Sequence, residues 1–149
     1  MSYVVDASVV IKWFHWEPLE DLALALLRAH GGNLEAPDFL LVEVANVSWK
    51  RVRLGEMTTE KAITIMTEIH DYIAKFHPSE DMVGHALDIS LALDHPVYDC
   101  LYLACAEASG RVLITDDTKL AAAVTGTAYE SLVQPLAGTS FTDPADGFH

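Results

Sequence analysis

The chain has 149 residues, of which 51% are hydrophobic and 21% are charged, so it is long enough for one domain with a real core and too apolar to be disordered. Nine basic residues against 22 acidic ones give a net charge of −13, which disfavours non-specific attraction to nucleic-acid phosphates. Any nucleic-acid function therefore has to rest on a local site.

Membrane and secretory segments are not expected. No apolar run approaches the roughly 20 residues of a membrane span, and Asp6 interrupts the N-terminal stretch where a signal peptide needs apolar sequence. Cys100 and Cys105 are five positions apart in an expected helix, which places them on different faces and disfavours a disulfide or a shared metal. We therefore expect a cytoplasmic protein with no membrane partner.

The predicted elements alternate between short apolar strands and helices. In chain order we expect a strand at 2–6, helices at 7–14 and 18–30, a short strand and turn at 33–38, helices at 39–55, 58–76, 79–94 and 100–109, a strand at 111–115 and a helix at 117–124. This alternation is typical of the α/β class. It predicts a three-layer α/β/α sandwich with a small, mostly parallel sheet of four or five strands.

The domain is expected to span residues 1–135. The remaining segment, 136–149, is small, polar and rich in turn residues, so we expect a flexible C-terminal tail.

Acids stand directly after the two clearest strands. Asp6 follows "YVV", and Asp116 and Asp117 follow "VLIT". Any one of them has a simple structural explanation, because Asp is a favoured N-cap of a helix. In a parallel sheet, however, the carboxyl ends of the strands meet at one edge, where ligands bind. The fold therefore gives these acids a reason to converge.

Two further acids lie in expected helices. Asp99 is at the start of the buried helix "CLYLACA", which is again a capping position. Glu43 interrupts a strongly apolar run in mid-helix, with Asn46 one turn later and Lys50 one turn beyond that. This stripe either faces solvent or faces a polar cavity at the edge of the sheet.

The acids together predict a cation site. Carboxylates brought close together repel one another unless a cation neutralises them. A cluster of Asp and Glu without His or Cys suits a hard, oxygen-preferring ion, Mg²⁺ or Mn²⁺. Such a site activates water and stabilises charge on a phosphoryl group, which indicates phosphodiester or phosphomonoester chemistry.

Four segments carry a family resemblance. "VVDASVVIKWF", "LLVEVANVSWK", "HPVYDCLYLACAEASG" and "RVLITDDTKL", in this order, resemble a PIN domain, and more narrowly the VapC-type toxins of toxin–antitoxin pairs. The resemblance covers residues 1 to about 135. It implies a metal-dependent endoribonuclease that cleaves RNA, is often a homodimer, and is held inactive by a cognate antitoxin protein.

The resemblance also implies roles for individual residues. Asp6, Glu43 and Asp99 match the first three acids of the family, and Asp117 is favoured over Asp116 as the fourth because the family pattern is Thr-x-Asp. Ser8, Asn46 and Thr115 are the groups expected to orient the carboxylates.

The basic residues are considered apart from the resemblance. Lys50, Arg51 and Arg53 form the densest basic patch, which either holds RNA phosphates or is a solvated helix end. Lys12 is a further candidate for RNA contact.

Alternatives remain open. An aspartyl-phosphate receiver or a phosphatase-like protein also places an Asp after its first strand, but the phosphatases usually have a second Asp where this chain has Ser8. A non-catalytic PIN-like binding module is the other alternative, although all four acid positions are filled. The aromatic cluster Trp13, Phe14 and Trp16 is open to two interpretations, packing or stacking on bases.

Overall fold

The computed structural model describes residues 2–141 of the chain, in which five parallel strands form one sheet in the order β3-β2-β1-β4-β5. The strands are β1 (Tyr3–Val5), β2 (Glu35–Pro37), β3 (Lys75–His77), β4 (Val112–Thr115) and β5 (Val133–Pro135). The α-helices are α1 (Ala7–Val10), α2 (Glu20–His30), α3 (Phe39–Arg53), α4 (Thr59–Tyr72), α5 (Val83–Leu93), α6 (Val97–Ser109) and α7 (Thr118–Val124). Three 3₁₀ turns, Ile11–Trp13, Ser79–Asp81 and Glu130–Leu132, complete the described elements.

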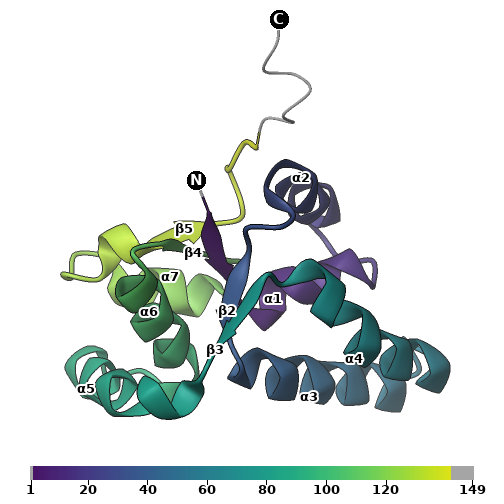
Figure 1. The fold of residues 1–149 in the computed structure, drawn as a ribbon, viewed down its shortest axis with the longest axis horizontal. Helices are drawn as coiled ribbons and strands as arrows, with labels where there is room; N and C mark the ends of the chain where they lie inside the picture. The colour runs from purple at the N-terminus through teal and green to yellow at the C-terminus, as the bar shows by residue number, and fades with distance from the viewer. Residues whose placement is uncertain (1, 142–149) are drawn as a thin grey trace, which may run out of the picture.

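Helices cover both faces of the sheet. Helices α5 and α6 lie on one side, and α1, α3 and α4 lie on the other (Figure 1). The α/β/α sandwich with a parallel sheet is therefore confirmed. Asp6 and the Asp116–Asp117 turn follow the central neighbouring strands β1 and β4, so the expected convergence at the carboxyl edge is also present.

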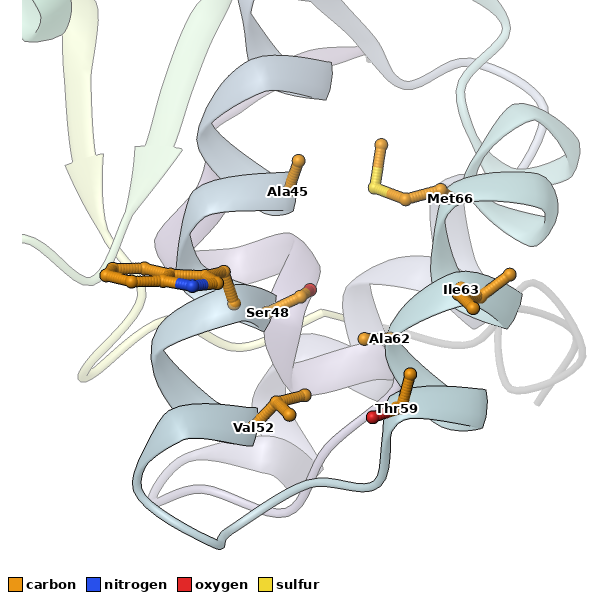
Figure 2. A pocket seen from close by; sticks show the side chains of 8 residues that line it. Ala45, Ser48, Val52, Thr59, Ala62, Ile63 and Met66 are labelled. Carbon is orange, nitrogen blue, oxygen red and sulfur yellow. The ribbon is translucent and has the colours of Figure 1, made fainter.

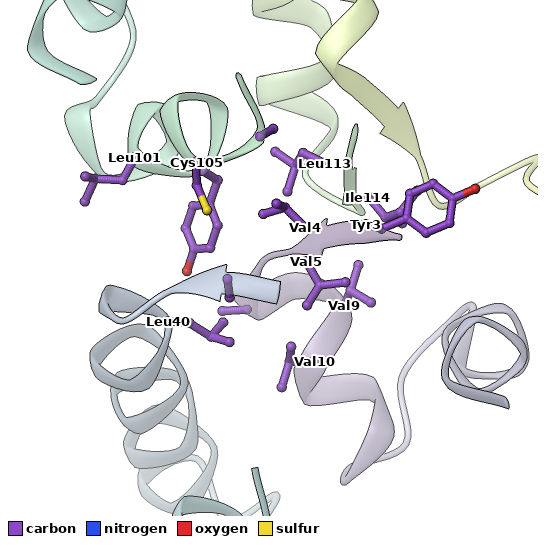
Figure 3. Close-up of a cluster of buried hydrophobic side chains, with 14 of the residues drawn as sticks. Tyr3, Val4, Val5, Val9, Val10, Leu40, Leu101, Cys105, Leu113 and Ile114 are labelled. Atoms are coloured by element: carbon purple, nitrogen blue, oxygen red, sulfur yellow. The ribbon is translucent and has the colours of Figure 1, made fainter. Parts of the chain in front are cut away.

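The core is built on the two central strands. Val4 of β1 lies on the same side of the sheet as Leu101 and Cys105 of α6, while Val5 lies toward Val9 of α1 (Figure 3). Strand residues on both faces are buried, which explains why β1 and β4 read as continuous apolar runs instead of alternating ones. The cysteines Cys100 and Cys105 are both buried and unbridged.

The two edge strands, β3 and β5, were not expected from the sequence. The helix predicted for 58–76 ends at Tyr72, since Ile73 adopts an extended backbone and residues 75–77 then pair with β2. Strand β5 pairs only with β4 and ends in Pro135, which an edge strand tolerates. Their sequences, "KFH" and "VQP", are not apolar runs, and no residue of either strand is buried.

The packed domain continues beyond residue 135. Leu136 is fully buried, and the Phe141 ring lies edge-on to Tyr3 and His30, with ring centroids 6.1 Å apart in both cases. The first part of the predicted tail is thus docked on the domain. Residues 142–149 lie outside the described residues. Within residues 2–141, no helix has both the length and the apolarity that crossing a membrane requires.

Candidate functional site

Asp6 occupies the turn between β1 and α1. Its side chain is only 6% exposed, and it accepts a hydrogen bond from the Val9 N–H, so it does cap α1. The cap leaves room for more partners. The Ser8 hydroxyl donates to Oδ1 at 2.5 Å, and the Thr115 hydroxyl donates to Oδ2. Asp6 is therefore held rigidly by neutral donors, with no basic side chain bonded to it in residues 2–141.

The same hydroxyls tie Asp6 to the turn after β4. The Ser8 hydroxyl accepts from the Asp116 N–H at 2.9 Å, and the Thr115 hydroxyl accepts from the Asp117 N–H at 3.0 Å. Ser8 and Thr115 thus orient the Asp6 carboxylate and fix the backbone of the acidic turn against it. This is the geometry expected of groups that support ligand carboxylates.

Glu43 approaches the site from α3. One of its oxygens, Oε1, is buried and has no hydrogen-bonding partner among the described residues. The Tyr102 hydroxyl of α6, which is also buried without a partner of ordinary geometry, lies close enough to lower the pKa of Glu43. Burial outweighs this effect and raises the pKa of Glu43, with the charges of Asp99 and Asp117 adding to the rise. One Glu43 oxygen therefore lacks a hydrogen bond of ordinary geometry among the described residues, although the Tyr102 hydroxyl lies nearby.

Asp99 comes from the first turn of α6, and the capping interpretation does not hold for it. The N-cap of α6 is Pro96, which makes no side-chain capping hydrogen bond. Asp99 Oδ2 instead pairs with His95 Nε2 at 2.7 Å. Burial raises the pKa of Asp99, the hydrogen bond to His95 opposes this, and the charge of Asp117 raises it again.

Asp116 and Asp117 have different surroundings. Asp117 caps α7 through Oδ1, which accepts from the N–H groups of Lys119 and Leu120, and its charge acts on both Glu43 and Asp99. Asp116 turns the other way and pairs with Lys12 Nζ at 3.0 Å. The geometry therefore supports Asp117 over Asp116 as the fourth member of the cluster.

The cluster is electrostatically crowded. Burial raises the pKa of Asp6 to about 7, and the charges of Glu43 and Asp99 push it in the same direction, while the two hydroxyls oppose the shift. Within residues 2–141, no three His, Cys, Asp or Glu side chains already stand close enough together to be the ligands of one ion. The acids converge, but closing them around a cation requires side-chain movement.

The basic residues expected at RNA have varied surroundings. Lys12 is 4% exposed and bonds to Glu17 as well as to Asp116, and Arg51 pairs with Glu17 and Glu56. Their charges are compensated within the protein. Lys50 and Arg53 are exposed, and the Arg53 guanidinium lies over the exposed Trp49 ring.

The three residues of the aromatic cluster, Trp13, Phe14 and Trp16, have different surroundings. Trp13 and Phe14 pack edge-on against Tyr72, and Trp13 Nε1 donates to the Ala23 carbonyl. These contacts support the packing interpretation for both residues. Trp16 is 76% exposed and lines a separate hollow formed by residues 16–21 and Leu24.

An open cleft of about 690 Å³ gives access to two of the acids, Glu43 and Asp99. It is lined by Glu43, Asn46 and Asp99 together with Phe39, Val42, Pro96 and Tyr98. Asn46 is exposed toward solvent, which puts its amide at the cleft and not beneath the carboxylates. Sequence reasoning missed His95 and Tyr102, since a His before a helix and a Tyr inside an apolar helix both resemble structural residues. The i, i+4 spacing of His95 and Asp99 was the available signal.

Comparison with known proteins agrees with this geometry. The family model of the PIN domain matches residues 3–125. Ribonuclease VapC3 from Pyrobaculum aerophilum is 30% identical over 123 residues, which cover 81% of this chain and 93% of that protein. PAE2754, also from Pyrobaculum aerophilum, has a crystal structure that matches with a TM-score of 0.66 and 22% identity over 91% of this chain and 84% of that one.

A third match is a complex. VapBC-5 from Mycobacterium tuberculosis, a member of the VapBC family of toxin–antitoxin systems, matches with a TM-score of 0.55 and 17% identity over 90% of this chain and 96% of that one. The sequence relationship covers most of both chains, and the order of strands, helices and acids is the one that the resemblance implied. This chain belongs to the PIN-domain family and, within it, to the VapC type.

Proposed function

We propose that this PIN-domain protein is an endoribonuclease that uses a divalent cation, Mg²⁺ or Mn²⁺, to cleave RNA, and that it is the toxin of a type II toxin–antitoxin pair. The observation that carries the proposal is the imbalance of charge at the carboxyl edge of the sheet. Asp6, Glu43 and Asp99 all have raised pKa values there, and one buried oxygen of Glu43 lacks a hydrogen bond of ordinary geometry among the described residues.

The residues fit a hard divalent cation. The available donors are carboxylate oxygens, which Mg²⁺ and Mn²⁺ prefer, and the unpartnered Glu43 Oε1 is the kind of atom that a cation would satisfy. Asp6, Glu43, Asp99 and Asp117 would hold the ion. When bound, it supplies charge stabilisation at the phosphate and a lower pKa for water.

The chain's own side chains prepare this site. Ser8 and Thr115 fix the orientation of Asp6, and the bond from His95 holds Asp99 toward the cleft. Holding these two carboxylates in place leaves the rearrangement needed for ion binding to the other acids, and preorganised charge is a main source of electrostatic stabilisation in enzymes. Family membership offers no support to a receiver or phosphatase-like function. The filled acid positions likewise offer none to a non-catalytic module.

A second copy of the chain is the first proposed partner. Val83, Leu87 and Leu91 of α5 are 47%, 50% and 74% exposed, and their spacing of four residues places them in one apolar stripe. A cytoplasmic homodimer would bury this stripe. Light scattering at tens of micromolar (about the range in which modest interfaces hold) should show a dimer, and Leu91→Glu should shift it to monomer.

The second proposed partner is an antitoxin. An apolar groove of about 310 Å³ lies between α3 and α4, with Ala45 and Ser48 on one wall and Ala62, Ile63 and Met66 on the other (Figure 2). Ser48 Oγ is buried and has no partner among the described residues. We assign this groove to an antitoxin segment. Ile63→Asp should abolish co-purification with the antitoxin encoded by a neighbouring gene and leave RNA cleavage intact.

The decisive experiment is a cleavage assay on single-stranded RNA with Mg²⁺ or Mn²⁺. Wild-type protein should cut internal phosphodiester bonds, and excess EDTA should stop the reaction. Undiminished cleavage in EDTA would contradict metal dependence. No cleavage under any divalent ion, by a protein with a normal melting curve, would contradict the nuclease itself. Phosphorylation of Asp6 by a small phosphodonor would revive the receiver alternative.

A further inference from the structure

An acidic nuclease needs a source of RNA affinity other than charge. The chain carries a net charge of −13, and two of its basic residues near the site, Lys12 and Arg51, are already bonded to carboxylates. Stacking of bases on aromatic rings contributes affinity that does not depend on positive charge or on base identity. An exposed ring beside the carboxylates would supply such affinity.

Tyr98 is such a ring. It immediately precedes Asp99 in α6, it is 61% exposed, and it lines the same cleft as Glu43 and Asp99. Its other face stacks on Phe39, with ring centroids 5.5 Å apart and an interplanar angle of 12°. A large side chain that is well supported on one face and open on the other is a platform and not a loose surface residue.

The platform is also fixed to the backbone on both sides. Pro96, the N-cap of α6, restrains the start of the helix that carries Tyr98. Phe39 begins α3, where its N–H bonds to the Ser79 hydroxyl, and its ring packs on the core. The two rings therefore keep their orientation relative to Glu43 and Asp99, which belong to the same two helices.

We propose that the open face of Tyr98 binds one nucleobase of single-stranded RNA next to the phosphodiester bond that is cleaved. A base in a duplex has both faces covered by its neighbours, whereas an unpaired base has a face free to stack. The exposed Asn46 also lines this cleft, so its amide is available to the bound base. This inference rests on the proposed nuclease function and adds a residue that binds and positions the substrate.

The first test separates binding from chemistry by steady-state kinetics. Tyr98→Ala should raise KM for a single-stranded RNA about tenfold, an amount within the range measured for loss of one stacked base, with little change in kcat. Tyr98→Phe keeps the ring and should stay within about twofold of wild type. Trp16→Ala removes a comparably exposed ring from another hollow and should change nothing.

The second test locates the base. A single abasic nucleotide moved along the RNA should weaken wild-type binding most at one position beside the cut, and Tyr98→Ala should be indifferent to that position. For a fluorescence test, 2-aminopurine replaces the base at that position of the RNA, and all proteins also carry Asp6→Asn so that the RNA stays uncut. Binding should lower the fluorescence of 2-aminopurine when position 98 is the native Tyr and in Tyr98→Phe, but not in Tyr98→Ala.

Specific outcomes would overturn the inference. One is a Tyr98→Ala protein with an unchanged KM. Another is wild-type binding that is weakened equally by an abasic nucleotide at every position of the RNA. A third is a loss of dimer in Tyr98→Ala that accounts for the whole effect, which would mean that a second copy covers this ring. If wild type cleaves RNA and Tyr98→Ala behaves like it, only this inference fails. If wild type neither cleaves nor binds RNA, the proposed function fails with it.

Discussion

Two buried carboxylates, Glu35 and Asp6, are handled in opposite ways. Glu35 is 8% exposed and belongs to β2. Asp6 is 6% exposed and directly follows the neighbouring strand β1. Glu35 bonds to Arg111 at 2.7 Å and to His77 at 2.6 Å. Among the residues that the structure describes, the partners of Asp6 are neutral donors, the hydroxyls of Ser8 and Thr115 and a backbone N–H.

The difference shows what is structural and what is functional. Burying a carboxylate is costly unless a positive partner compensates it. At Glu35 the chain supplies that partner itself. At Asp6 it supplies two more acids, Glu43 and Asp99, whose charges raise the pKa of Asp6 further. A site that a protein leaves short of positive charge is one that a cation from solution can complete.

The largest expected effect is on catalysis. Asp6→Asn and Asp99→Asn each remove a charge from the cluster while keeping the side-chain shape, so RNA cleavage should fall at least about 100-fold in each. Both variants should remain folded, because Asn keeps the cap at position 6 and Asp99 caps nothing. The measurements are initial cleavage rates and melting curves. Full activity in both folded variants would break the comparison.

The next effect is on stability as a function of pH without metal. A carboxyl whose pKa rises from about 4 in the unfolded chain to about 7 in the fold holds its proton more tightly when folded, so the unfolding free energy falls as pH rises between those values. The loss from pH 5 to pH 8 should reach about 2 to 4 kcal/mol. Thermal melts in EDTA across this range measure it.

Metal and substitution provide the controls for the pH effect. Mg²⁺ or Mn²⁺ competes with protons for the carboxylates, so either ion should raise the melting temperature more at pH 8 than at pH 5. Asp6→Asn cannot ionise and should flatten the pH dependence. A melting temperature that is constant from pH 5 to pH 8 in EDTA would show that Asp6 is not destabilised by burial.

The sequence predicted the convergence of the acids because parallel strands end at one edge. That rule needs only two recognisable strands, "YVV" and "VLIT", and both are buried on two faces. It did not predict the edge strands β3 and β5, since neither is an apolar run like "YVV" and each forms by pairing with a neighbour instead of by local preference.

Side-chain partnerships were the other part that the sequence did not predict. Whether Lys12 contacts RNA or a carboxylate depends on how the turn Ile11–Trp13 directs its side chain, and the fold directs it to Asp116 and Glu17. Tyr98 was not predicted as a site residue, because its stacking on Phe39 joins α6 to α3. Such facts depend on the packing of helices that are far apart in the chain.

The third prediction tests the compensated side of the comparison. Glu35→Gln removes the partner of Arg111 and His77 without changing volume, and should cost about 2 kcal/mol of stability, or about 4 to 8 °C in melting temperature. RNA cleavage per folded molecule should be unchanged, because Glu35 takes no part in the acidic cluster. A large loss of activity with normal stability would show that the two regions are not separate.

The smallest effect should come from Asp116, which shares one feature with each of the two compared acids. It follows β4 beside Asp117, yet its carboxylate pairs with Lys12, as a structural acid would. Lys12 keeps Glu17 when Asp116 is neutralised, so Asp116→Asn should change cleavage less than about threefold and stability by about 1 kcal/mol at most.

Asp117→Asn is the matched control. It keeps the α7 cap but removes a charge that acts on Glu43 and Asp99, and should lower cleavage about tenfold or more. Parallel rate measurements on the two variants decide which acid belongs to the cluster, and a greater loss from Asp116→Asn would reverse the assignment.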